Sequence, residues 1–70
     1  MHTRLDVLRR QSDLVAACTD ETLAGQLGND NLYGSPASFW GDALRAGLVT
    51  QAEYDQARHL VGSSWNYRGD

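Results

Sequence analysis

One cysteine, two histidines and two pairs of neighbouring carboxylates are the side chains of this sequence that could carry out chemistry. Cys18 and His59 would have to act as nucleophile and base, but no third group is placed to orient them, and His59 falls on the solvated face of a predicted helix. A metal site would have to gather His2, His59, Cys18 and a carboxylate from positions without ligand spacing. We therefore expect no catalytic residue, no metal ligand and no cofactor.

The paired carboxylates have a structural interpretation. Asp20 and Glu21 form one pair, Glu53 and Asp55 form the other, and each pair lies in the first turn of a predicted helix, where negative charge complements the helix dipole. The sequence also lacks the glycine-rich phosphate loops, the nucleophile elbow and the zinc-binding His-Glu-x-x-His motif. The prediction is a protein that is not an enzyme and has no small-molecule substrate.

Length and charge narrow the class of protein further. The 70 residues suffice for a single domain, residues 1–70, with a small core. A net charge of −3 argues against nucleic acid as a partner. No apolar run approaches the length of a membrane span, and the N-terminal residues lack a signal-peptide segment. A single cysteine cannot form a disulfide within the chain. We expect a cytoplasmic protein, and the absence of lysine and isoleucine suggests a GC-rich bacterial or phage genome.

The N-terminal half of the sequence predicts two helices. Thr3 followed by Asp6 is a capping pattern and predicts a helix over residues 4–18. Thr19 is the predicted cap of a second helix over residues 20–27. Leu5, Leu8, Val15 and Cys18 fall near one face of the first helix, with Val7 and Leu14 beside it. The second helix is predicted to carry Leu23, Ala24 and Leu27 inward and to end at Gly28. Residues 29–34 are predicted to be the main loop, with Leu32 and Tyr33 as apolar anchors.

The C-terminal half predicts a helical hairpin. Ser35 and Pro36 mark the start of a helix over residues 36–46, with Trp40 as the central core residue. Gly47 is expected to end it, and Thr50 begins the capping pattern of a last helix over residues 51–62. Residues 63–70 form a polar tail that carries two aromatic side chains. The predicted fold class is all-α, a small bundle of three to four short helices with a C-terminal antiparallel helical hairpin.

Residues 39–61 resemble the short helical hairpin called the SHOCT domain. The resemblance rests on six residues, four in the turn and two in the helix after it: Gly47, Leu48, Val49, Thr50, Glu53 and Tyr54. It covers about a third of the chain. The resemblance implies a hairpin that is used for oligomerisation or for contact with another protein.

These observations favour a small non-catalytic protein-interaction module that binds itself, as a homodimer, or another protein, as an adaptor or inhibitor. Trp65, Tyr67 and Arg68 are the predicted partner-binding residues, because these residue types are enriched at interface hot spots. The alternative for the tail is that its aromatic side chains close the core of an undersized domain. The alternatives for function are a helix-turn-helix transcription regulator and an acidic inhibitor that mimics nucleic acid.

Overall fold

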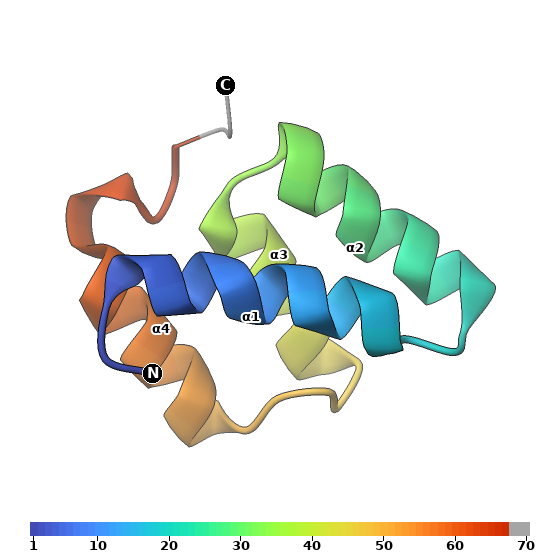
Figure 1. Ribbon diagram of the computed structural model, residues 1–70, viewed down its shortest axis with the longest axis horizontal. Helices are drawn as coiled ribbons and strands as arrows, with labels where there is room; N and C mark the ends of the chain where they lie inside the picture. The colour runs from blue at the N-terminus through green and yellow to red at the C-terminus, as the bar shows by residue number, and fades with distance from the viewer. Residues whose placement is uncertain (68–70) are drawn as a thin grey trace.

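The computed structural model describes residues 1–67, which form four α-helices and one short 3₁₀ helix and contain no strand. The elements are α1 (Arg4–Ala17), α2 (Glu21–Tyr33), α3 (Pro36–Arg45), α4 (Gln51–Val61) and η1 (Gly62–Ser64). Helix α1 packs mainly against α2 and α4, and α3 packs against the same two helices, so the four helices surround one core (Figure 1). This confirms the predicted all-α fold, a small helical bundle.

The start of α1 is fixed by a reciprocal capping box. The Thr3 hydroxyl accepts a hydrogen bond from the backbone N–H of Asp6 at 3.2 Å, and the Asp6 carboxylate accepts one from the Thr3 N–H at 3.0 Å. The Asp6 carboxylate also accepts the N–H of His2 at 2.8 Å. The backbone hydrogen bonds from His2 and Thr3 lower the pKa of Asp6 below its ordinary value. The predicted cap of this helix is therefore present.

The α3–α4 hairpin also begins and turns at the predicted residues. Ser35 caps α3, with Pro36 in its first turn, and the Thr50 hydroxyl accepts the N–H of Glu53 at 3.1 Å to cap α4. Gly47 has a φ of 76°, in the left-handed region that a residue with a Cβ adopts only under strain. The α3 end and the α4 start are thus set by residues inside the turn itself.

The prediction for the second helix was wrong at both ends. Asp20, not Thr19, is the cap, because its carboxylate accepts a backbone N–H of the first turn at 3.1 Å. The helix does not stop at Gly28 but continues to Tyr33, so most of the predicted loop 29–34 is helical. Leu32 and Tyr33, expected as anchors, are exposed.

Tertiary contacts account for this extension. The Asn31 side chain accepts a hydrogen bond from the Gln11 amide of α1 at 3.0 Å, which holds a residue of poor helix propensity within α2. The helix ends at Gly34, whose N–H donates to the Asp30 carbonyl at 2.9 Å. A Cβ on Gly34 would lie 2.9 Å from that carbonyl oxygen, so this close approach requires a glycine.

The core is built around two adjacent aromatic residues of α3. Trp40 and Phe39 are fully buried, and their rings meet edge to face with centroids 6.2 Å apart. All four helices and the segment after η1 contribute to the cluster, whose members are Val7, Leu14, Leu27, Phe39, Trp40, Ala43, Val49, Ala57, Val61 and Trp65. The prediction of Trp40 as a central core residue is confirmed.

The predicted inward face of α1 requires a correction. Val7, Gln11 and Leu14 are buried, whereas Leu5 is 54% exposed and Leu8 is 40% exposed. The buried residues recur at i, i+4 and i+7, which is one helical face, but a polar side chain occupies its centre. Val7 and Leu14, which were predicted to lie beside the apolar face, are therefore at the core together with Gln11, and the prediction of Leu5 and Leu8 as inward residues was wrong.

Candidate interaction surface

The cysteine and the exposed histidine have separate surroundings. The Cys18 thiol lies after the end of α1, with its sulfur 3.5 Å from the carbonyl oxygen of Asp20. His59 is exposed on α4, and no contact between it and Cys18 is seen among the described residues. Residues 1–67 contain no group of three or more His, Cys, Asp or Glu side chains arranged to hold a metal ion.

The carboxylates singled out in the sequence act within the fold. Asp20 caps α2, and Glu21 follows it in the positive first turn of that helix. Glu53 lies in the first turn of α4 and forms an ion pair with Arg10 of α1, with 3.2 Å between the Arg10 Nε and the Glu53 Oε2. This ion pair links two helices that are distant in sequence. Asp55 accepts a hydrogen bond from the Gln51 amide at 3.0 Å. The contacts of Asp20, Glu53 and Asp55, and the position of Glu21 in a first helical turn, give these carboxylates structural roles.

Trp65 of the tail belongs to the core. Its side chain is only 5% exposed and meets the Tyr54 ring edge to face, with centroids 5.4 Å apart. Its carbonyl oxygen accepts the backbone N–H of Ala37 at 2.8 Å, which satisfies a donor in the first turn of α3. Trp65 therefore closes the core, as the alternative for the tail expected, and its burial leaves little side-chain surface for a partner.

The other two predicted partner-binding residues differ from Trp65. Tyr67 is 70% exposed and lines a shallow groove of about 390 Å³ between α1, the end of α2 and the start of α3. Arg68 lies outside the described residues. The lining of this groove includes Arg4, Leu8, Gln11, Asp30, Asn31 and Tyr67. Both apolar and polar side chains are therefore accessible at this edge of α1.

A buried hydrogen-bond network forms the floor of the groove. The Gln11 carbonyl accepts the indole N–H of Trp40 at 3.1 Å, and its amide donates to Asn31 at 3.0 Å. One glutamine thus satisfies the buried donor of a core tryptophan and joins α1 to both α2 and α3. Sequence reasoning missed this residue, although its position four residues after Val7 and three before Leu14 was the available signal.

A carboxyl group of α2 is destabilised in its charged form. Asp30 has a buried Oδ2 without a hydrogen-bond donor, and its neighbour across the helix pair is Asp42 of α3. Burial, followed by the interaction with Asp42, raises the pKa of Asp30 to about 6, although the charge of Arg45 acts in the opposite direction. A hydrogen bond between the two carboxyl groups requires a proton on one of them. Protonation of Asp30 therefore favours the packing of α2 on α3.

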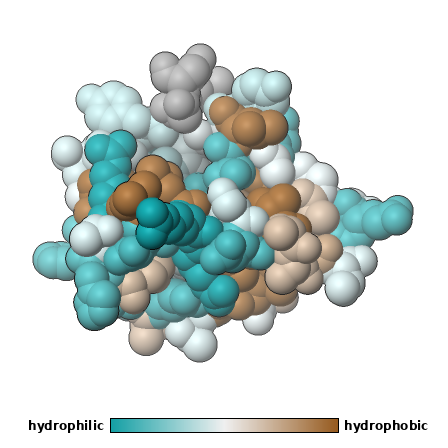
Figure 2. All heavy atoms as spheres, in the orientation of Figure 1, coloured by the Kyte–Doolittle hydropathy of each residue, from teal (hydrophilic) through white to brown (hydrophobic). Residues whose placement is uncertain are grey.

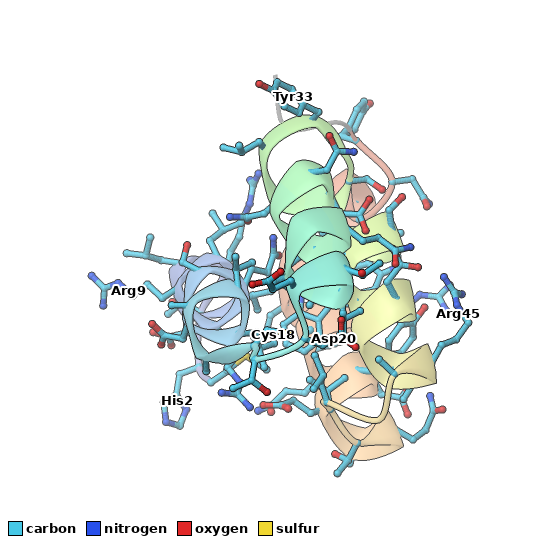
Figure 3. The ribbon with its side chains drawn as sticks, turned by 90° about the vertical axis from the view of Figure 1, so that its right-hand side faces the viewer. His2, Arg9, Cys18, Asp20, Tyr33 and Arg45 are labelled. Carbon is cyan, nitrogen blue, oxygen red and sulfur yellow. The ribbon has the colours of Figure 1, made fainter. Side chains whose placement is uncertain are left out.

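The outer face of α1 is an exposed surface of the described residues that lies on the side of the helix opposite the core. We use this name for five exposed residues on the side opposite the core, Leu5, Leu8, Arg9, Ser12 and Ala16. In Figure 2, hydrophobic and hydrophilic residues lie side by side over α1, which crosses the front of the molecule in this view. Figure 3 looks along α1 and shows Arg9 extending away from the other helices. This face combines large apolar side chains with a guanidinium group.

No helix among residues 1–67 combines the length and apolar character needed to cross a bilayer.

Comparisons of the chain with protein-family models, with curated proteins and with solved structures found no match.

Proposed function

We propose that this chain is a small non-catalytic protein-interaction module, which binds a second copy of itself or another protein through the outer face of α1. The observation that carries the proposal is that α1 buries Gln11 while it exposes Leu5 and Leu8. A single exposed leucine is common in soluble proteins. Here two exposed leucines lie one turn apart on one face of α1, while the core-facing side of the same helix carries a glutamine. Such a pair of leucines is typical of a helix that makes apolar contacts on its outer face as well as with its own core.

The neighbouring groove extends this surface. Leu8 belongs to both the outer face and the lining of the groove, and Tyr67 also lines the groove. Arg4 also lines the groove, and neither Arg4 nor Arg9 forms an ion pair within residues 1–67. Tyrosine and arginine are enriched among residues that dominate binding energy, and arginine supplies planar donors for a carboxylate partner.

The proposal includes no catalysis and no cofactor. Three of the four paired carboxylates act within the fold: Asp20 as a helix cap, Glu53 in an ion pair and Asp55 in a hydrogen bond. A cytoplasmic location and a bacterial or phage origin remain predictions from the sequence. So do the alternatives of a transcription regulator and an acidic mimic of nucleic acid. DNA reading by α4 gains no support, since its first two turns present carboxylates.

Site-specific photocrosslinking tests this function even where the partner is unidentified. A benzophenone amino acid is placed at Leu5, on the outer face, or at Ala46, which is exposed at the end of α3. After irradiation in the native cytosol, we expect covalent adducts with a defined polypeptide from position 5 and none from position 46. The absence of adducts at position 5, or equal labelling from both positions, would contradict the proposal.

A further inference from the structure

Resting on this proposed function, we infer that the occupant of the outer face is a second copy of this chain, with its α1 antiparallel to the first. In this arrangement Leu5 and Leu8 of one copy lie against Ala16 and Ser12 of the other. The same contacts are repeated by the two-fold axis, so the surface is self-complementary.

The spacing of the exposed residues supports helix-to-helix packing. Leu5, Leu8, Ser12 and Ala16 are all exposed and recur at intervals of three, four and four residues, which is the spacing of a seam between two helices. The seam runs along the side of α1 opposite Val7, Gln11 and Leu14. It therefore stays exposed when α1 packs against the other helices of residues 1–67.

The sizes of these residues favour the antiparallel orientation. The two leucines occupy the first half of α1, and the two small residues, Ser12 and Ala16, occupy the second half. Antiparallel packing sets each large side chain against a small one and fills the interface evenly. A parallel pair would oppose leucine with leucine at one end and would leave a gap between small residues at the other.

Charge supports the same orientation independently of size. Arg9 borders the seam near the middle of α1, and Asp13 lies one turn further along on the same side of it. Both are exposed, and neither forms an ion pair within residues 1–67. In an antiparallel pair Arg9 of each copy approaches Asp13 of the other, whereas a parallel pair brings two Arg9 side chains together.

The size of the contact predicts a weak dimer. A helix of 14 residues is about 21 Å long, and one helix pair with its flanking side chains falls at or below the lower limit of stable interfaces. The core of the described residues is complete within one copy. We therefore expect a folded monomer in reversible equilibrium with the dimer, with a concentration dependence visible in the micromolar range or above.

Charge reversal provides the test, with the full chain measured by sedimentation equilibrium over a wide concentration range. The variants are Arg9→Asp, Asp13→Arg and the double variant. Arg58→Asp, at an exposed position of α4, is the control with the same change in net charge as Arg9→Asp. Each single reversal should weaken self-association about tenfold or more, because it makes two symmetry-related contacts repulsive. The double variant should restore it, and so should an equimolar mixture of the two single variants.

Thermal melting of each variant shows whether the monomer remains folded, which separates loss of the interface from loss of α1. A wild-type chain that stays monomeric at millimolar concentration would overturn the second-copy inference. So would a double variant that does not recover, or a control that weakens association as much as the reversals. Photocrosslinks from position 5 to a different polypeptide would retain the proposed function and reject the second copy, whereas no crosslinks at all would reject both.

Discussion

In the α3–α4 hairpin, large apolar side chains lie in the core and the cap residues lie within the hairpin or immediately before it, whereas α1 buries Gln11 and exposes Leu5 and Leu8. The hairpin is therefore organised by local contacts, and α1 is organised by a hydrogen bond to Trp40, 29 residues away along the chain. An apolar residue has the same cost of exposure in either region. The difference teaches that a hydrogen bond to another helix can set which side of α1 faces the core, even where this leaves two leucines exposed.

The largest expected effect is in the core of the hairpin. Trp40→Ala removes a fully buried indole and should lower the free energy of unfolding by ~3–5 kcal/mol, as other large-to-small core substitutions do. A domain of this size has a similar total stability, so thermal melts should show a largely unfolded chain at room temperature. Leu5→Ala is the matched change on the outer face and should shift the unfolding free energy of the monomer by less than about 0.5 kcal/mol. Equal effects of the two substitutions would remove the contrast between the regions.

The next effect concerns the polar centre of α1. Gln11→Leu leaves the buried indole N–H of Trp40 and the side-chain oxygen of Asn31 without this partner, and should destabilise the fold by about 1–3 kcal/mol. Chemical denaturation measures it. Trp40→Phe in the same background removes the orphaned donor, so the double variant should be more stable than the sum of the two single effects predicts. Strict additivity would show that the hydrogen bond has no energetic role.

A smaller effect depends on pH and lies between α2 and α3. The pKa of Asp30 is raised to about 6 in the folded chain, against about 3.9 when unfolded, so the folded state binds more protons between these values. Stability should therefore rise as the pH falls from about 6 to about 4. Asp30→Asn should stabilise the protein at pH 7 by about 1–2 kcal/mol, with allowance for the partial exposure of the residue, and flatten this pH dependence. Melting curves of both proteins across the range decide it, and an unchanged slope in the variant would assign the dependence elsewhere.

The smallest effect tests whether the start of α4 is fixed by its cap residue. Thr50→Ala removes the hydroxyl that accepts the Glu53 N–H and should cost ~1 kcal/mol. Thr50→Ser retains the hydroxyl and should recover most of the loss. The thermal midpoint is a sufficient measurement, and a serine variant as unstable as the alanine variant would show that the cap is not the source of the effect.

Local signals in the sequence were sufficient where the partner of a residue lies within one helical turn. The caps at Thr3, Ser35 and Thr50 and the positive φ of Gly47 were all predictable, because each depends on a hydrogen bond or a steric rule involving nearby residues. The apolar stripe of α3 likewise identified Trp40. These features together determine the class of fold.

The candidate interaction surface could not be predicted in the same way. A glutamine is normally exposed, and only the arrival of Trp40 and Asn31 from other helices makes its burial favourable. With Gln11 inside, the helix rotates and Leu5 and Leu8 face outward. The same hydrogen bond to Asn31 carries α2 through the predicted loop, against the weak helix propensity of its last residues.

For the described residues, the sequence by itself determined the all-α class, the starts of three α-helices and the turn between α3 and α4, because these depend on contacts a few residues apart. Only the tertiary structure decided the rotation of α1, the length of α2 and the burial of Trp65. Each of these depends on a partner brought from another element, and the free energy of that contact outweighs the local preference of the residues involved.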